Sequence, residues 1–380
     1  MVAPRLEPAP LSAQPDVDPR VNAWLEIDLN ALRLNLGDIR SHLAPATQVM
    51  AIVKADAYGH GAPYVAQTLL AAGASRLGVA TVFEAEQLRH AGITAPILIL
   101  GPLLPAQLDS ALNVDAEVMI SSAQGAQELA AAAGRRRLRA KAHVKIDTGM
   151  GRVGLQPADG LALIQQWEGI GPVDLIGVCT HFAAAEDQPD FTAAQIAVFR
   201  AVLQDTPGTP LRHAANSAGT LNHPDSHFDL VRPGIALYGG ARVPGAPERP
   251  VMHLQARLTL IKDVPVGSTL GYGRTYTVTR PMTVGLVPLG YADGLPRALS
   301  NRQDVLVHGR RCPLVGVISM DQCLVDLTGV AAAPGDAVVL LGDQGDDRIT
   351  AHDWADASGT ITYEILCRLG SSRLARFYRL

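Results

Sequence analysis

The sequence has few of the features that mark membrane or nucleic-acid-binding proteins. Its longest apolar runs, such as Pro96–Leu100 and Val284–Leu289, are far too short to span a bilayer. Charged residues make up 18% of the 380 residues and the net charge is only −4, so no bias toward nucleic acid or membrane surfaces is expected. Apolar residues make up 48%, which is typical of a soluble globular protein.

Cysteine is also scarce. No CxxC pair occurs among the four cysteines, which are Cys179, Cys312, Cys323 and Cys367. No cluster of histidine, cysteine and carboxylate residues has the spacing of metal ligands, so no metal site is expected. The first 20 residues are rich in proline and alanine and lack the apolar core of a signal peptide. We therefore expect a disordered leader over residues 1–20, reduced cysteines and a cytoplasmic location.

A dinucleotide-binding fingerprint is missing as well, because no GxGxxG motif follows any predicted strand. From about residue 45 to 245, short apolar runs alternate with helical patterns, and this alternation predicts a parallel sheet. Eight runs favour an α/β fold with a (β/α)8 TIM-like barrel over an open doubly wound sheet, and we assign residues 21–245 to this domain. The predicted strands are Val49–Val53, Leu77–Ala80, Ile97–Leu100, Glu117–Ile120, His143–Ile146, Leu175–Cys179, Leu211–Ala214 and Phe228–Val231.

Helical patterns separate most of these strands. Asp28 is a good N-cap for a helix over residues 28–42. Thr81 and Glu84 have the three-residue spacing of a capping box at the start of a later helix. The other predicted helices are Tyr64–Ala72, Phe83–Ala91, Ala123–Ala133, Leu161–Trp167 and Ala193–Leu203.

The pattern changes after about residue 245, where Gly245–Pro250 is typical of a linker. Short runs separated by turn residues then predict a mostly-β domain over residues 246–380. The predicted strands are Ala256–Lys262, Thr283–Pro288, Val305–Val307, Leu314–Ile318, Cys323–Leu327 and Ala337–Leu341. One short helix is expected at Ala351–Ala357.

Lys54 ends the first buried strand and precedes a polar loop that contains Tyr58, Gly59 and Gly61. A lysine in this place can simply pack its stem and extend its ammonium into water. It can also be a catalytic amine, because desolvation lowers the pKa of a lysine and makes the neutral nucleophile available. The two glycines would let backbone and a cofactor come close, which favours a catalytic lysine, and the family resemblance given below implies that Lys54 is a Schiff-base lysine.

Polar residues follow the seventh and eighth predicted strands, where a barrel places its phosphate site. Asn216 and Ser217 follow the seventh strand, and Arg232 to Ile235 follow the eighth. Ser217 can donate a hydroxyl, and Gly234 allows backbone N–H groups to approach an anion closely. In isolation both stretches could be ordinary turns, but their position favours a phosphate-binding role.

Two further strand ends carry candidate residues. Lys145, Asp147 and Arg152 lie at the mouth end of the fifth strand, and a surface salt-bridge cluster is the alternative explanation for them. His181 ends the sixth run, where its ring could stack on a flat cofactor or be a satisfied core histidine.

The predicted β domain contains three turn-like motifs with large side chains. They are Gly271–Tyr276, Leu289–Gly294 and Ser319–Gln322, which include Tyr272, Tyr291, Met320 and Asp321. Local pattern alone does not make these residues catalytic.

Taken together, these motifs resemble those of alanine racemases, a family of fold-type III pyridoxal 5'-phosphate enzymes. The resemblance runs from about Trp24 to Tyr378. It implies that Lys54 holds the cofactor and that Tyr272, from the neighbouring subunit, is the second catalytic base. It implies a phosphate site made by Tyr58, Ser217, Gly234, Ile235 and Tyr363, with His181 against the pyridine ring, Asn216 close by and Arg232 at the ring nitrogen. Arg152 and the partner's Met320 would bind the substrate carboxylate, with Lys145, Tyr291 and Asp321 in supporting roles.

The family differs from this chain in one place, since many members have serine where Gly271 stands before the tyrosine. The resemblance implies a homodimer with shared active sites that interconverts L-alanine and D-alanine by a two-base mechanism, supplying D-alanine for peptidoglycan. A racemase of broader specificity for small amino acids, such as serine, is the closest alternative. A non-catalytic cofactor-binding barrel lacks the β domain, and a basic amino-acid decarboxylase would carry a cysteine-containing motif that we do not find.

Overall fold

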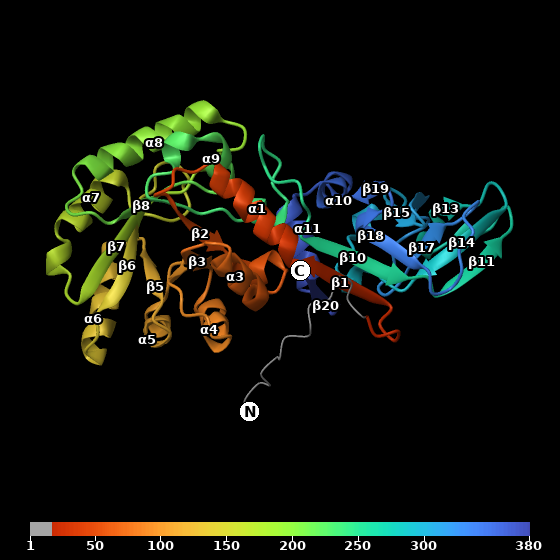
Figure 1. Ribbon diagram of the computed structural model, residues 1–380, viewed down its shortest axis with the longest axis horizontal. Helices are drawn as coiled ribbons and strands as arrows, with labels where there is room; N and C mark the ends of the chain where they lie inside the picture. Colours follow the sequence, from red (N-terminus) through yellow and green to blue (C-terminus); the bar gives the residue numbers. More distant parts are fainter. Residues whose placement is uncertain (1–16) are drawn as a thin grey trace. The chain divides into compact units, whose positions relative to one another are not determined.

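The computed structural model describes residues 17–380, so most of the leader predicted over residues 1–20 lies outside the described residues. The chain divides into two compact units (Figure 1). One contains Leu32–Ala57 and Ala62–Glu248. The other contains residues 17–31, the short segment Tyr58–Gly61, and Arg249–Leu380.

The first unit is a closed barrel of eight parallel strands, which confirms the predicted α/β fold. Its closure is visible in the pairing of the first and last strands, where Gln48 lies opposite Leu230 and Val49 opposite Val231. Most barrel-strand residues are buried, as expected of strands covered by helices. The strands are β2 (Gln48–Ile52), β3 (Arg76–Val79), β4 (Ile97–Ile99), β5 (Glu117–Ile120), β6 (Ala140–Lys145), β7 (Val173–Cys179), β8 (Leu211–His213) and β9 (Leu230–Val231).

Helices connect these strands, as the apolar periodicity predicts. Asp28 Oδ1 accepts a hydrogen bond from the Ala31 N–H at the start of α1, and the capping box of Thr81 and Glu84 is present at the start of α4. Helices α5 and α9 were not predicted from the sequence. The helices are α1 (Leu29–Ser41), α2 (Lys54–Tyr58), α3 (Ala62–Ala71), α4 (Val82–His90), α5 (Pro105–Asn113), α6 (Ala123–Arg136), α7 (Pro157–Gln165), α8 (Pro189–Gln204) and α9 (Ser217–Asn222).

The second unit is mostly β and is built around three sheets. The largest has the order β16-β15-β18-β10-β1-β20, with β19 paired to β18. Its strands are β1 (Ala23–Asp28), β10 (Met252–Arg257), β15 (Asp304–Val307), β16 (Arg310–Pro313), β18 (Ala337–Gln344), β19 (Asp347–Ile349) and β20 (Ala375–Arg379). The smaller sheets contain β11 (Leu260–Val264), β14 (Met282–Val287) and β17 (Cys323–Asp326), and β12 (Thr269–Leu270) with β13 (Tyr276–Thr277). Two helices follow, α10 (Ala351–Ser358) and α11 (Thr362–Gly370).

Two predicted strands of this unit are wrong, and strand β1 was not predicted. Ala256–Lys262 is not one strand, because β10 and β11 belong to different sheets with a break at Leu258 and Thr259. Leu314–Ile318 forms only an isolated bridge between Leu314 and Val325. Strand β1, between β10 and β20, was missed because its partners lie more than 200 residues away in the chain.

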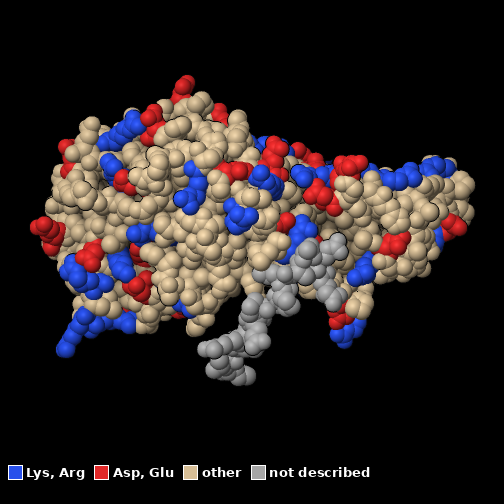
Figure 2. All heavy atoms as spheres, in the orientation of Figure 1, with Lys and Arg blue, Asp and Glu red and all other residues tan. Residues whose placement is uncertain are grey.

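The face of the molecule seen in Figure 2 carries no large region of one charge. In Figure 2, lysine and arginine side chains are interspersed with aspartate and glutamate over the visible face of each unit. Among residues 17–380, no helix combines the length and the apolar character needed to cross a bilayer.

Candidate functional site

The predicted barrel residues lie at the carboxyl ends of their strands. Lys54 follows β2 after a single residue and begins the short turn α2. His181 follows β7, Asn216 and Ser217 follow β8, and Arg232 follows β9 directly. The carboxyl ends of parallel barrel strands meet at one face, which is where barrel enzymes carry their active sites. The structure therefore brings these residues to the same end of the barrel.

Arg232 is buried and held by the backbone of two neighbouring strand ends. Its Nη2 donates to the carbonyl oxygens of Thr180 at 2.7 Å and Ala214 at 2.9 Å, and lies 3.3 Å from His181 Nδ1. Its Nη1 lies 2.7 Å from His213 Nδ1. Because an arginine only donates, His213 Nδ1 must be the acceptor and carry no proton.

A chain of hydrogen bonds continues from Arg232 through the barrel interior. His213 Nε2 lies 2.9 Å from His143 Nδ1, and His143 Nε2 lies 2.9 Å from Glu117 Oε2. The far oxygen of Glu117 accepts from Arg76. Since Arg232 forces His213 to donate through Nε2, His143 must accept at Nδ1 and donate to the carboxylate. Both histidines are therefore neutral, with every hydrogen bond pointing from Arg232 toward Glu117.

The directions of the pKa shifts agree with this arrangement. Burial is the main cause that lowers the pKa values of His143 and His213, and the charge of Arg232 acts in the same direction. Burial alone would raise the pKa of Glu117, but His143 and Arg76 outweigh it and leave this pKa below its ordinary value. The sequence analysis missed this chain, although polar residues inside buried strands are a signal that could have indicated it.

The mouth of the barrel concentrates positive charge. Burial lowers the pKa of His181 well below its ordinary value, and four cations act in the same direction: Arg232, Lys145, Arg152 and Lys54. Lys145 is itself buried, and burial together with Arg232 and Arg152 lowers its pKa. Arg152 is exposed. Asp147 does not pair with it but accepts from the N–H groups of Gly149 at 3.0 Å and Gly151 at 3.1 Å. The mouth is thus suited to an anion.

Ser217 forms the centre of a small backbone cradle. Its Oγ accepts from the N–H groups of Gly234 at 2.9 Å and Ala236 at 3.2 Å. A hydroxyl that accepts two hydrogen bonds still has its own hydrogen to donate. Ile235 is buried between these two donors, and Asn216 caps α9 by accepting from the Gly219 N–H at 2.8 Å. The structure brings the predicted phosphate residues of the barrel together.

Tyr58 and Tyr363 lie together in the second unit. Their ring centroids are 6.0 Å apart, and Tyr58 is buried. Burial, followed by Tyr363 and Cys367, raises the pKa of Tyr58, so its phenol stays protonated and can donate a hydrogen bond. The neighbouring Gly59 has φ of +85°, and a Cβ there would lie 2.5 Å from the carbonyl oxygen of Leu366. The chain after Lys54 therefore packs directly against the backbone of α11.

Tyr291 and Met320 lie on loops of the second unit that share hydrogen bonds, and Tyr272 lies on another loop of this unit. The N–H of Tyr291 donates to the Ser319 carbonyl and that of Ala292 to the Met320 carbonyl, both at 3.0 Å. Tyr272, Met320 and Tyr291 are exposed, with 73%, 53% and 37% of their surfaces accessible. All three side chains are therefore accessible from the solvent.

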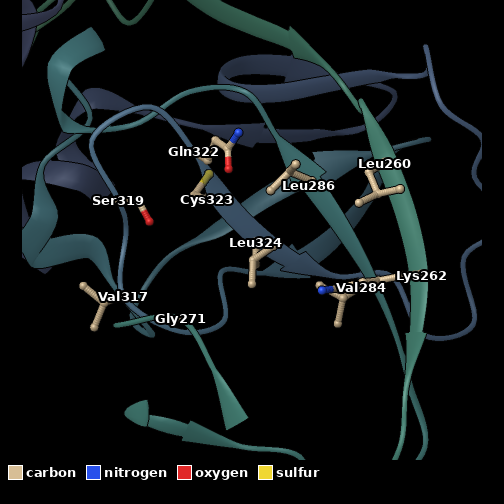
Figure 3. A pocket seen from close by; sticks show the side chains of 10 residues that line it. All are labelled: Leu260, Lys262, Gly271, Val284, Leu286, Val317, Ser319, Gln322, Cys323 and Leu324. Carbon is tan, nitrogen blue, oxygen red and sulfur yellow. The ribbon is translucent and has the colours of Figure 1, made fainter. Parts of the chain in front are cut away.

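A cavity of about 300 Å³ lies beside these loops, in the sheet of β11, β14 and β17 (Figure 3). Gly271 and Val317 line it, and so do Leu286 and Leu324. In the same unit, Arg373 Nε donates to buried Asp293 at 2.7 Å, and its Nη2 pairs with the predicted supporting residue Asp321. Asp293 also accepts from the Gly290 N–H at 2.9 Å, so Asp321 belongs to the bracing of the Tyr291 turn.

Comparison with known proteins gives a consistent result over the whole chain. The model of the alanine racemase N-terminal domain matches residues 27–242, and that of the C-terminal domain matches residues 251–378. The alanine racemase of Symbiobacterium thermophilum is 42% identical over 96% of this chain and 98% of its own. The solved alanine racemase of Streptomyces coelicolor is 42% identical, with a TM-score of 0.88 over 96% of this chain and 99% of that chain. That of Streptomyces lavendulae is 41% identical, with a TM-score of 0.87 over 94% and 97%.

Proposed function

The chain belongs to the alanine racemase family and is therefore an enzyme that interconverts L-alanine and D-alanine, and we propose that it works with pyridoxal 5'-phosphate in a site shared between two subunits. The observation that carries the cofactor proposal is the geometry of Arg232. Among the described residues, its Nη1 and Nη2 groups donate to His213, Thr180 and Ala214, and no hydrogen bond engages its Nε–H. A single acceptor such as a pyridine nitrogen suits this remaining donor.

The other residues also fit a planar, phosphorylated aldehyde. The Ser217 hydroxyl hydrogen and the phenol of Tyr58 are donors for phosphate oxygens, and we assign Gly234, Ile235 and Tyr363 to the same site. His181 would pack on the ring, with Asn216 beside it. When bound, the cofactor supplies the electron sink that makes the α-proton of the substrate acidic.

Two bases on opposite faces of the substrate carry the proposed proton transfers. Lys54 Nζ would bind the cofactor aldehyde at rest, and when released it would exchange a proton with the substrate Cα on the side of the D-enantiomer. The phenol oxygen of Tyr272 of the partner subunit would exchange the proton on the side of the L-enantiomer.

Arginine at the ring nitrogen has a specific consequence. Arg232 stays protonated at any working pH, so it donates a hydrogen bond there without giving up its proton. The neutral His213 supports this state, since it can only accept from Arg232. We propose that this restrains charge delocalisation into the ring and favours racemisation over transamination.

The substrate carboxylate is assigned to Arg152 and to Met320 of the partner subunit, with Tyr291 near the entrance. The lowered pKa of Lys145 favours its neutral amine, which is the form that carbamylation requires, and a carbamylated Lys145 would help to position Arg152. The exposure of Tyr272 and Met320 supports a homodimer in which a second copy covers this surface.

Two properties of the proposal concern the cell rather than the site. All four cysteines are free, which supports a reducing compartment such as the cytoplasm. From the family resemblance alone, we propose that the D-alanine enters peptidoglycan synthesis. A strain lacking this gene and any other racemase should then require D-alanine for growth.

The cofactor and its anchor can be tested on one sample. We expect an absorbance band near ~420 nm, borohydride label on Lys54 in a peptide map, and formation of D-alanine from L-alanine. If Lys54 is labelled but alanine is not turned over, the cofactor assignment stands and the substrate is another small amino acid. Absence of label after addition of pyridoxal phosphate would refute the role of Lys54.

The shared site can be tested with two inactive variants. Lys54→Ala and Tyr272→Phe should each be inactive alone, but a mixture under subunit exchange should recover activity because one site of the mixed dimer is intact. Continued inactivity with exchange demonstrated by mass spectrometry would refute the partner assignment of Tyr272.

A further inference from the structure

The turn after Lys54 has an unusual backbone. Ala55, Asp56, Ala57 and Tyr58 have φ values of +53°, +52°, +57° and +53°, which is a run of four residues in the left-handed region. None of them is glycine, so each adopts a conformation that is unfavourable for an L-residue. Such a run persists only where the surrounding structure holds it.

Two carboxylates hold this turn, one at each end. Asp56 Oδ1 accepts from the N–H of Ala62 at 2.7 Å, which closes the turn on the side of α3. Glu84 Oε1 accepts from the N–H of Ala55 at 2.6 Å, on the residue next to Lys54. Glu84 comes from α4, 29 residues further along the chain.

The two oxygens of Glu84 serve different purposes. Oε2 accepts from the N–H groups of Ala80 at 2.6 Å and Thr81 at 3.0 Å, and this completes the capping box of α4. Oε1 is not needed for the cap, because a capping box requires only the return bond to the N-cap residue. Its hydrogen bond to Ala55 therefore has a separate role.

We propose that Glu84 is a positioning residue, which fixes the left-handed turn and so directs the amine of Lys54 into the barrel mouth. This inference rests on the proposed role of Lys54. It requires a carboxylate in particular, because donors approach both oxygens of Glu84. Glutamine has a single acceptor oxygen, so its amide N–H would face either the Ala55 N–H or those of Ala80 and Thr81.

The experiment compares Glu84→Gln with Thr81→Ala in the holoenzyme. Thr81→Ala removes the hydroxyl that accepts from the Glu84 N–H at 3.3 Å, but leaves the carboxylate in place, so it is a matched control for loss of the helix cap. Hydrogen–deuterium exchange of the peptide over residues 50–60, the melting temperature, and kcat and KM for L-alanine are measured for both variants.

For Glu84→Gln we expect exchange at Ala55 and its neighbours to rise at least tenfold, and kcat to fall about tenfold with KM changed less than threefold. For Thr81→Ala we expect a lower melting temperature, with exchange over residues 54–58 and kcat within twofold of the parent. Equal effects of the two variants on exchange and kcat, or unchanged exchange in Glu84→Gln, would overturn the proposal.

If Glu84→Gln does not fold, a second variant can still test the proposal. Glu84→Asp keeps the charge but is one methylene shorter, so it cannot reach both Ala55 and the cap, and it should raise exchange over residues 54–58 in the same way. Borohydride labelling of the parent separates this proposal from the proposed function. If Lys54 is unlabelled there, the lysine assignment has failed, whereas the exchange data still decide whether Glu84 holds the turn.

Discussion

Replacing Glu117 by glutamine tests the buried chain that supports Arg232. Only 4% of the Glu117 side chain and 16% of its partner Arg76 are exposed, so the pair is largely shielded from water. Glutamine keeps the shape and one acceptor oxygen, which can accept from His143. Its amide N–H group then faces the Arg76 donor, and the charge that balances Arg76 is lost. Breaking a fully buried ion pair costs about 3–5 kcal/mol, and the retained hydrogen bond and partial exposure of Arg76 reduce this to about 2–3 kcal/mol.

The assay is native-state hydrogen exchange of the barrel strands β5 and β6, because these strands carry Glu117 and His143. Exchange locates the effect in one unit, whereas a global unfolding curve of a chain with two units is not two-state. The expected loss corresponds to protection that is lower by roughly 30- to 150-fold. Protection in the large sheet of the second unit should change by less than threefold.

The double variant Arg76→Met with Glu117→Gln is the control. Removing Arg76 should recover at least half of the lost protection, because it removes both the unpaired buried charge and the donor that faces the new amide. The reasoning is refuted if the exchange protection of β5 and β6 is the same in Glu117→Gln as in the parent. It is also refuted if this protection is no higher in the double variant than in the single one.

Three further predictions concern separate parts of the molecule. Burial, and after it the charge of Arg379, lowers the pKa of His253 in the folded protein to about 4. Below pH ~6.5 the unfolded chain therefore binds a proton that the folded chain does not, so stability decreases as the pH is lowered. Between pH 8 and pH 5 this should cost about 2 kcal/mol in urea unfolding of the second unit, and a His253→Gln variant that kept the full loss would contradict it. Gly59→Ala should lower stability by about 3 kcal/mol or prevent folding, because the new Cβ would lie 2.5 Å from the Leu366 carbonyl oxygen and 2.8 Å from the Gly370 Cα. A melting temperature equal to that of the parent would contradict this close packing. Ser217→Ala should weaken the binding of pyridoxal phosphate about tenfold, measured by equilibrium dialysis, while Ser217→Thr should keep most of the affinity. An equal loss of affinity in the two variants would exclude a role for the hydroxyl.

The barrel could be predicted from the sequence because each strand is a short apolar run bounded by a helical pattern. Those strand ends also located Lys54, His181, Ser217 and Arg232, since parallel barrel strands end at one face. The roles of these residues remain proposals that came from the family resemblance.

The β unit was harder to predict, because its strands are short and the partners are distant in the chain. Strand β1 pairs with β20 at the opposite end of the sequence, and no local pattern indicates that pairing. The apolar run Ala256–Lys262 looks continuous, yet the chain passes from one sheet to another within it.

Local sequence by itself determined the alternation of strands and helices, the capping box of Thr81 and Glu84, and the position of polar residues at strand ends. These features depend on residues a few positions apart, which the chain order specifies directly. Only the tertiary structure decided that Glu84 also reaches Ala55, that Arg232 keeps His213 and His143 neutral, and how much of Tyr272 is exposed. The hydrogen bonds of Glu84, Arg232 and His213 join residues that are 19 to 70 positions apart in the chain, so they depend on which atoms meet in space. The exposure of Tyr272 depends on which segments cover its side chain.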